Sequence, residues 1–103
     1  MAKVLKVAAV TELPPGSMKT FDIEGKLILI ANVDGVFYAM DAICSHEEWD
    51  LSEGMLEGTH VTCAGHGAVW DLRTGKAEFD EELQPLKTYK TILKDGEVLI
   101  ELE

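Results

Sequence analysis

The stretch CSHEEWDLSEGMLEGTHVTCAGH, residues 44–66, contains both cysteines and all three histidines of the 103-residue chain. It begins with a C-x-H motif, Cys44 and His46, and ends with a C-x-x-H motif, Cys63 and His66. Thiolate and imidazole ligands together suit zinc and iron–sulfur centres. The clustering therefore predicts a metal site built from two arms, each of which supplies one cysteine and one histidine.

The spacing favours a [2Fe–2S] cluster over zinc. A cluster with two cysteines on one iron and two histidines on the other needs one residue of each kind from each of two loops, and both arms meet that need. Two alternatives stay open on the residues alone: zinc bound by the same four side chains, and no metal, with buried cysteines and satisfied core histidines. His60 lies outside both motifs, so we expect a strand or surface residue there and not a ligand.

The rest of the chain has the features of a small all-β domain. Runs rich in apolar and β-branched residues predict strands at residues 4–10, 18–23 and 26–32. The dipeptides Asp34-Gly35 and Asp95-Gly96 lie between such runs and predict type I′ hairpin turns. Short strands with turn signals from end to end predict an antiparallel barrel or sandwich.

The regular pattern loosens between Asp41 and about Gly67, where glycines become frequent and the metal-binding residue types gather. We interpret this region as an insertion into the β domain. At 103 residues the chain is long enough for one domain with a modest core, so a second independent domain is not expected.

The charge balance bears on partners and location. The formal net charge of −10, from 19 acidic and 9 basic side chains, disfavours nucleic acid and anionic membranes and suits a partner with a basic docking face. The chain lacks an apolar run of membrane-spanning length, and its first residues lack a signal-peptide pattern. We therefore expect a soluble cytoplasmic protein, in which a metal role for the cysteines is favoured over a disulfide.

These motifs resemble Rieske-type [2Fe–2S] ferredoxins, in particular the ferredoxin components of bacterial aromatic-ring-hydroxylating dioxygenase systems. The resemblance covers essentially the whole chain, including residues 51–58, Trp70-Asp71, 73–75 and Pro85. It implies the Rieske fold: a single domain over residues 1–103, all-β, with an antiparallel base (sandwich or incomplete barrel) and an inserted cluster-binding part. The base would comprise residues 1–42 and 72–103, and the cluster-binding part residues 43–71.

The resemblance also implies the cofactor and its ligands: one Rieske-type [2Fe–2S] cluster, with Cys44 and Cys63 on the inner iron and His46 and His66 on the outer iron. Neutral imidazoles leave less negative charge on their iron than thiolates do, so the electron is expected to enter on the histidine side. Gly65 and Gly67 are expected to bring backbone N–H groups toward the sulfurs or to serve a tight turn.

The function implied by the resemblance is electron transport in aromatic hydrocarbon catabolism, without enzyme activity of its own. A flavin-dependent ferredoxin reductase would supply one electron at a time, and a terminal oxygenase would accept it. We expect a monomer that docks transiently with these partners and with neither nucleic acid nor a membrane. The alternative is a small Rieske-type subunit of a larger oxidoreductase such as nitrite reductase.

Departures from the related proteins of cytochrome bc-type complexes predict a low reduction potential. Those proteins carry an additional cysteine in each arm, where this chain has Trp49 and Gly65, and they use a serine and a tyrosine hydroxyl as donors to sulfur, where this chain has Ala68 and Trp70. Loss of such donors destabilises the reduced cluster, so we expect a potential of about −150 mV. The resemblance places Pro85 in a third loop that covers the cluster.

Overall fold

The computed structural model describes residues 3–43, 50–64, 67–78 and 85–102. Over these residues the chain forms ten strands and two short 3-10 helices. None of the helices found there is long and apolar enough to cross a membrane. In chain order the elements are β1 (Lys3–Ala9), η1 (Val10–Glu12), β2 (Met18–Ile23), β3 (Lys26–Val33), β4 (Val36–Asp41), η2 (Leu51–Glu53), β5 (Met55–Glu57), β6 (His60–Thr62), β7 (Val69–Asp71), β8 (Ala77–Glu78), β9 (Thr88–Lys94) and β10 (Glu97–Leu102).

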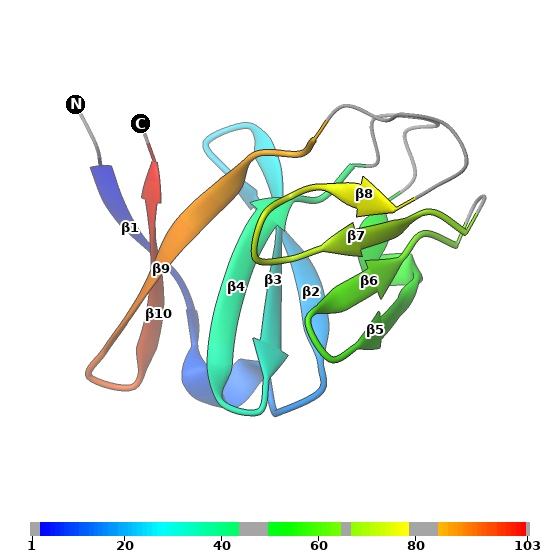
Figure 1. Cartoon of the computed structure of the whole chain (residues 1–103). Coiled ribbons are helices and arrows are strands. Elements are labelled where there is room, and N and C mark those ends of the chain that lie inside the picture. The colour runs from blue at the N-terminus through cyan, green and yellow to red at the C-terminus, as the bar shows by residue number, and fades with distance from the viewer. Residues whose placement is uncertain (1–2, 44–49, 65–66, 79–84, 103) are drawn as a thin grey trace.

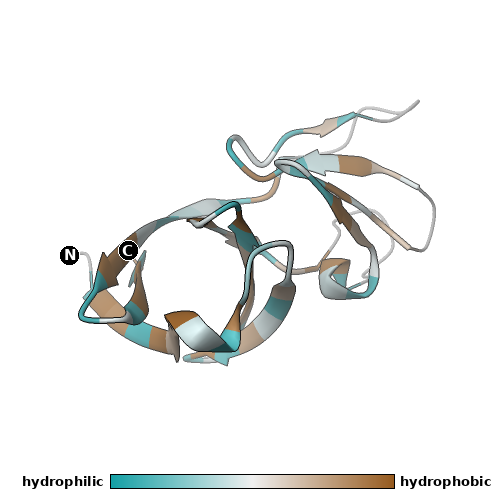
Figure 2. Ribbon diagram, turned by 90° about the horizontal axis from the view of Figure 1, so that it is seen from below, coloured by the Kyte–Doolittle hydropathy of each residue, from teal (hydrophilic) through white to brown (hydrophobic). Residues whose placement is uncertain are grey.

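The strands make two antiparallel sheets, which Figure 1 shows side by side. The larger has the order β1-β10-β9-β4-β3-β2, and the smaller has the order β5-β6-β7-β8. Seen from below, the larger sheet curls into an incomplete barrel, with the smaller sheet beside it (Figure 2). The predicted all-β antiparallel architecture is confirmed.

Three two-residue turns join neighbouring strands of the large sheet, and in each the first residue and the following glycine have positive φ. They are Glu24-Gly25 (53° and 85°), Asp34-Gly35 (51° and 90°) and Asp95-Gly96 (52° and 76°). This is the backbone of a type I′ turn, whose twist matches that of the flanking strands. The two Asp-Gly hairpins predicted from the sequence are therefore confirmed.

β3 is the central element of the core because both of its faces are buried. Alternate residues of a strand point to opposite sides of the sheet. Ile28 and Ile30 accordingly join a hydrophobic cluster inside the curled sheet, whereas Leu29 and Ala31 join a second cluster that includes side chains of the small sheet. The continuous apolar run of this strand thus holds the two sheets together.

The small sheet occupies much of the region interpreted as an insertion. Helix η2, β5 and β6 lie between Asp41 and Gly67, and the sheet continues through β7 to β8. The strands of this sheet have only two or three residues each, which is too short for the alternation that reveals strands in a sequence. The division into a base (1–42 and 72–103) and a cluster-binding part (43–71) stays a prediction.

Candidate iron–sulfur site

Cys63 is the one predicted ligand within the described residues; Cys44, His46 and His66 lie outside them. Cys63 directly follows β6, and its side chain is buried in the cluster between the sheets. Its N–H donates a hydrogen bond to the Ala68 carbonyl at 2.8 Å, and its own carbonyl accepts one from the Gly67 N–H at 3.0 Å. These bonds close the turn that links β6 to β7.

Gly67 takes part in this turn with a left-handed backbone, at φ 79°. No Cβ penalty opposes that conformation in glycine. Because its N–H donates to the carbonyl of Cys63, Gly67 serves a tight turn, whereas Gly65 lies outside the described residues.

The first arm begins and ends beside the same buried cluster. The Leu51 N–H donates to the Ala42 carbonyl at 2.8 Å, and Ile43 forms an isolated antiparallel bridge with Asp50. These contacts bring together the two ends of the segment 44–49. Ala42 and Leu51 share one hydrophobic cluster with Cys63, so the base of the first arm is held close to the second.

Asp50 anchors the end of this arm to the large sheet. Its Oδ1 accepts hydrogen bonds from the Thr20 hydroxyl at 2.6 Å, from the Ser52 N–H at 2.9 Å and from the Ser52 hydroxyl at 2.8 Å. Burial alone would raise the pKa of Asp50, but these hydrogen bonds together hold the pKa below its ordinary value. Sequence reasoning missed this residue, although Asp before a short helix is a recognisable N-cap signal.

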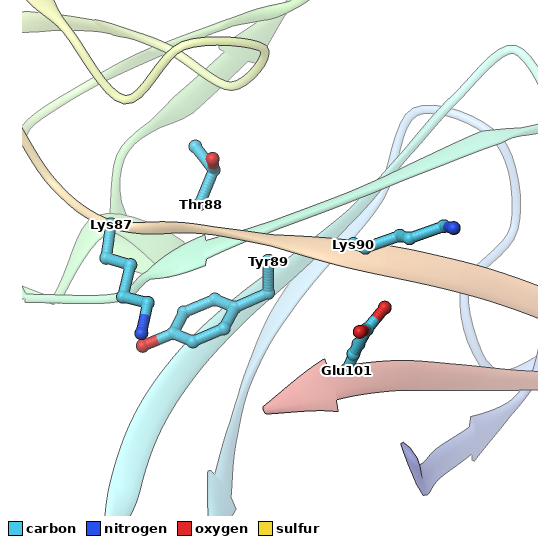
Figure 3. Close-up of a pocket in the computed structure, with 5 residues that line it drawn as sticks. All are labelled: Lys87, Thr88, Tyr89, Lys90 and Glu101. Carbon is cyan, nitrogen blue, oxygen red and sulfur yellow. The ribbon is translucent and has the colours of Figure 1, made fainter. Parts of the chain in front are cut away.

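The start of the first arm is also supported by the large sheet. Asp41, the last residue of β4, accepts a 2.6 Å hydrogen bond from the Tyr89 hydroxyl. The pKa of Tyr89 is raised, mainly by burial and further by this hydrogen bond to the Asp41 carboxylate. Tyr89 lines a shallow hollow with Lys87, Thr88, Lys90 and Glu101, and the Lys87 ammonium lies 5.4 Å from the centre of its ring (Figure 3).

His60 belongs to β6, as expected, and is half-buried. It lies opposite Asp71 in the sheet register, with its Nε2 3.9 Å from Asp71 Oδ2. Side-chain hydrogen bonds from the Arg73 guanidinium hold the pKa of Asp71 below its ordinary value. Because His60 and Cys63 are an odd number of residues apart on an extended chain, they face opposite sides of the sheet, which supports excluding His60 from the ligands.

Trp70 in β7 lies on the buried face of the small sheet and is 0% exposed. Its indole Nε1 is also buried and has no hydrogen-bond acceptor within the described part of the chain. The buried Cys63 thiol can ligate iron, and the Trp70 N–H on the same face can donate a hydrogen bond to an anionic sulfur atom. The described residues therefore fit an iron–sulfur cluster.

The chain after β8 returns to the site at Leu86, whose side chain belongs to the cluster that contains Cys63 and Trp70. The Leu86 N–H donates to the Gly75 carbonyl at 2.8 Å, which fixes this segment to the turn between β7 and β8. Pro85, immediately before it, is exposed. Its predicted place in a loop over the cluster stays a prediction, since residues 79–84 lie outside the described ranges.

Comparison with known proteins identifies the family. The family model for the Rieske [2Fe–2S] domain matches residues 3–90. The chain belongs to the Rieske [2Fe–2S] family. This membership confirms the resemblance inferred from the two arms, and it confirms a Rieske-type [2Fe–2S] cluster as the cofactor.

Individual relatives of this Rieske protein support the assignment along nearly its full length. The ferredoxin component of biphenyl 2,3-dioxygenase from Rhodococcus jostii is 41% identical over 98 residues, which cover 95% of this chain and 92% of the relative. The solved ferredoxin of Sphingomonas yanoikuyae B1 has a TM-score of 0.90 at 29% identity. The match covers 98% of this chain and 100% of the ferredoxin chain. The Rieske fold is confirmed by this likeness.

A solved complex of reduced oxygenase and oxidized ferredoxin in carbazole 1,9a-dioxygenase also contains a similar chain. The TM-score is 0.87 at 31% identity, with 94% of this chain and 91% of that chain covered.

Proposed function

We propose that this protein is a one-electron carrier that accepts electrons from a flavin-dependent reductase and delivers them to the terminal oxygenase of an aromatic-ring-hydroxylating system. The observation that carries the proposal is full-length similarity to dioxygenase ferredoxin components, on a fold that buries Cys63 beside the base of the first arm. The similar chain in the oxygenase–ferredoxin complex supports an oxygenase as the acceptor. The reductase is inferred from the general composition of such systems.

The proposed ligands are Cys44 and Cys63 on one iron and His46 and His66 on the other. When bound, the cluster supplies a centre that takes up and releases single electrons. The described residues serve to position it: the turn after β6 fixes Cys63, and the bridge between Ile43 and Asp50 closes the first arm. The buried side chains between the sheets keep water from the sulfur side.

We assign the protein an electron-transfer role and no substrate chemistry of its own, and we propose a cytoplasmic location. The base (1–42 and 72–103) would serve as a scaffold, and residues 43–71 would present the cluster to the partner. Docking would be transient, because the carrier must leave the reductase before it reaches the oxygenase.

The direct test is an anaerobic transfer experiment with the oxygenase encoded nearest to this gene. Dithionite-reduced protein, freed of excess dithionite, should be reoxidised on mixing while the Rieske centre of the oxygenase becomes reduced. Protein without its cluster is the control and should transfer nothing. Stable co-purification of the native chain with a large catalytic subunit would contradict the shuttle and favour the subunit alternative.

The ligand assignment has its own test, in which alanine replaces each histidine in turn. His46→Ala and His66→Ala should remove or severely disrupt the cluster, because each deletes one of two nitrogen ligands to the same iron. His60→Ala is the matched control and should retain the wild-type visible spectrum and iron content. Cluster loss in the His60 variant alone would show that the assignment is wrong.

A further inference from the structure

The Trp70 indole N–H is a buried hydrogen-bond donor whose acceptor is still to be identified. Its Nε1 is buried without an acceptor in the described residues, and it is the one side-chain nitrogen or oxygen among them in that condition. A buried donor without an acceptor costs roughly 1–3 kcal/mol, so native proteins nearly always provide a partner. The partner of this N–H is therefore to be sought in something that the protein binds.

The sheet register places Trp70 near Cys63. Trp70 lies directly opposite Val61. Cys63 comes two residues after Val61 along the chain, so its side chain points to the same face of the sheet. Such diagonal neighbours have Cα atoms roughly 7–8 Å apart, a separation that an aromatic side chain spans. All three side chains belong to one buried cluster, and Trp70 is fully excluded from solvent.

The chemistry of the cofactor supplies the missing acceptor. Thiolate and sulfide atoms of an iron–sulfur cluster accept hydrogen bonds, and they do so more strongly when the cluster carries the additional negative charge of its reduced form. We propose that the Trp70 indole N–H donates a hydrogen bond to a sulfur of the bound cluster and so raises its reduction potential. This inference rests on the proposed cluster site.

At position 70 the tyrosine hydroxyl of the bc-type proteins is replaced by a tryptophan indole, so the sequence alone predicts the loss of a donor there. The indole N–H retains a donor there in another form, whereas the donor at position 68 is absent because Ala68 has no polar side-chain atom. The chain accordingly lacks one donor, not two.

The test is the reduction potential of Trp70→Phe, which deletes the N–H and keeps an aromatic ring. We expect the equilibrium constant for one-electron reduction to fall about tenfold, because a hydrogen bond to a charged acceptor is lost. That change corresponds to a shift of ~59 mV to more negative potential. Thr91→Val, which removes the hydroxyl bonded to the Phe37 carbonyl in the large sheet, is the control and should leave the potential unchanged.

A second measurement on the unmodified sequence does not depend on the variant folding. In protein labelled with ¹⁵N at the indole nitrogens, pulsed EPR of the reduced cluster should show a weak ¹⁵N coupling from Trp70. Trp49 is the only other tryptophan, so loss of the coupling in Trp70→Phe would assign it. Absence of any indole coupling in labelled wild-type protein would overturn the hydrogen bond.

Different results would refute the hydrogen bond and the cluster site. Wild-type protein with a normal cluster, no indole coupling and a potential unaffected by Trp70→Phe would refute the hydrogen bond alone. Wild-type protein purified without iron would refute the cluster site, and the hydrogen bond with it.

Discussion

Gly75 combines a left-handed backbone, at φ 77°, with a close neighbour: a Cβ added there would collide with the carbonyl oxygen of Leu86. Gly75→Ala should therefore destabilise the protein both by backbone strain and by displacing the segment that contains Leu86. Gly16 has a similar φ of 87° with open space around it, so Gly16→Ala introduces the strain alone. Urea unfolding should show that Gly75→Ala costs about 1–3 kcal/mol more than Gly16→Ala. Equal losses would contradict a steric role for this glycine.

The potential of the wild-type cluster is also decided by single residues. Ala68 is buried beside Cys63 and offers no side-chain donor, which leaves the reduced cluster less stabilised than in proteins with a hydroxyl at the matching position. Because the Trp70 donor is retained, we expect protein-film voltammetry to give a value in the lower part of the Rieske range, above the value of about −150 mV expected when both donors are lost. A value above roughly +100 mV would show that missing donors do not control the potential.

At the scale of elements, the contact between Thr20 in β2 and Asp50 beside η2 joins the large sheet to the first arm. Thr20→Val should lower the free energy of unfolding at pH 7 by about 1–2 kcal/mol, because the half-buried carboxylate of Asp50 loses a donor. Thr91→Val deletes a hydroxyl bond of the same length, 2.6 Å, whose acceptor is a neutral carbonyl, and serves as the matched control.

The pH dependence separates these two variants. The pKa of Asp50 is lowered in the folded protein, so its contribution to stability is complete above its ordinary pKa of 3.8 and is lost as pH falls through the lower folded value. The destabilisation caused by Thr20→Val should therefore shrink below about pH 4, whereas that of Thr91→Val should stay constant. Thermal unfolding of both variants from pH 3 to 7 checks this. A penalty for Thr20→Val that does not change with pH would exclude charge on Asp50 as its source.

The elements of the large sheet could be predicted because their runs are long and two of their three two-residue turns are Asp-Gly. The run at residues 18–23 matches β2 without a shift, and the run at 26–32 falls one residue short of β3. The small sheet could not be predicted strand by strand, since two or three residues show no alternation. The two arms were visible in the sequence because cysteine and histidine are rare. The anchor at Asp50 and the unmatched Trp70 N–H depend on contacts between distant segments. The spacing of residues along the sequence does not predict such contacts.

For the whole molecule, the charge of −10 should matter when the protein meets its partners. If the docking face of the reductase is basic, attraction speeds the encounter, and added salt weakens it. We expect the rate of electron transfer from the reductase to fall as NaCl is raised from 20 to 500 mM. Over this range the Debye length shortens from ~20 Å to under ~5 Å. A rate independent of salt would rule out electrostatic steering.

The central claim for the whole molecule is a cluster whose second iron is bound by two imidazoles. Pulsed EPR of the reduced protein, labelled with ¹⁵N only at histidine, tests it most directly. We predict strong couplings from two directly bound nitrogens, which persist in His60→Ala. A reduced protein without these couplings, or one that contains zinc in place of iron, would contradict it.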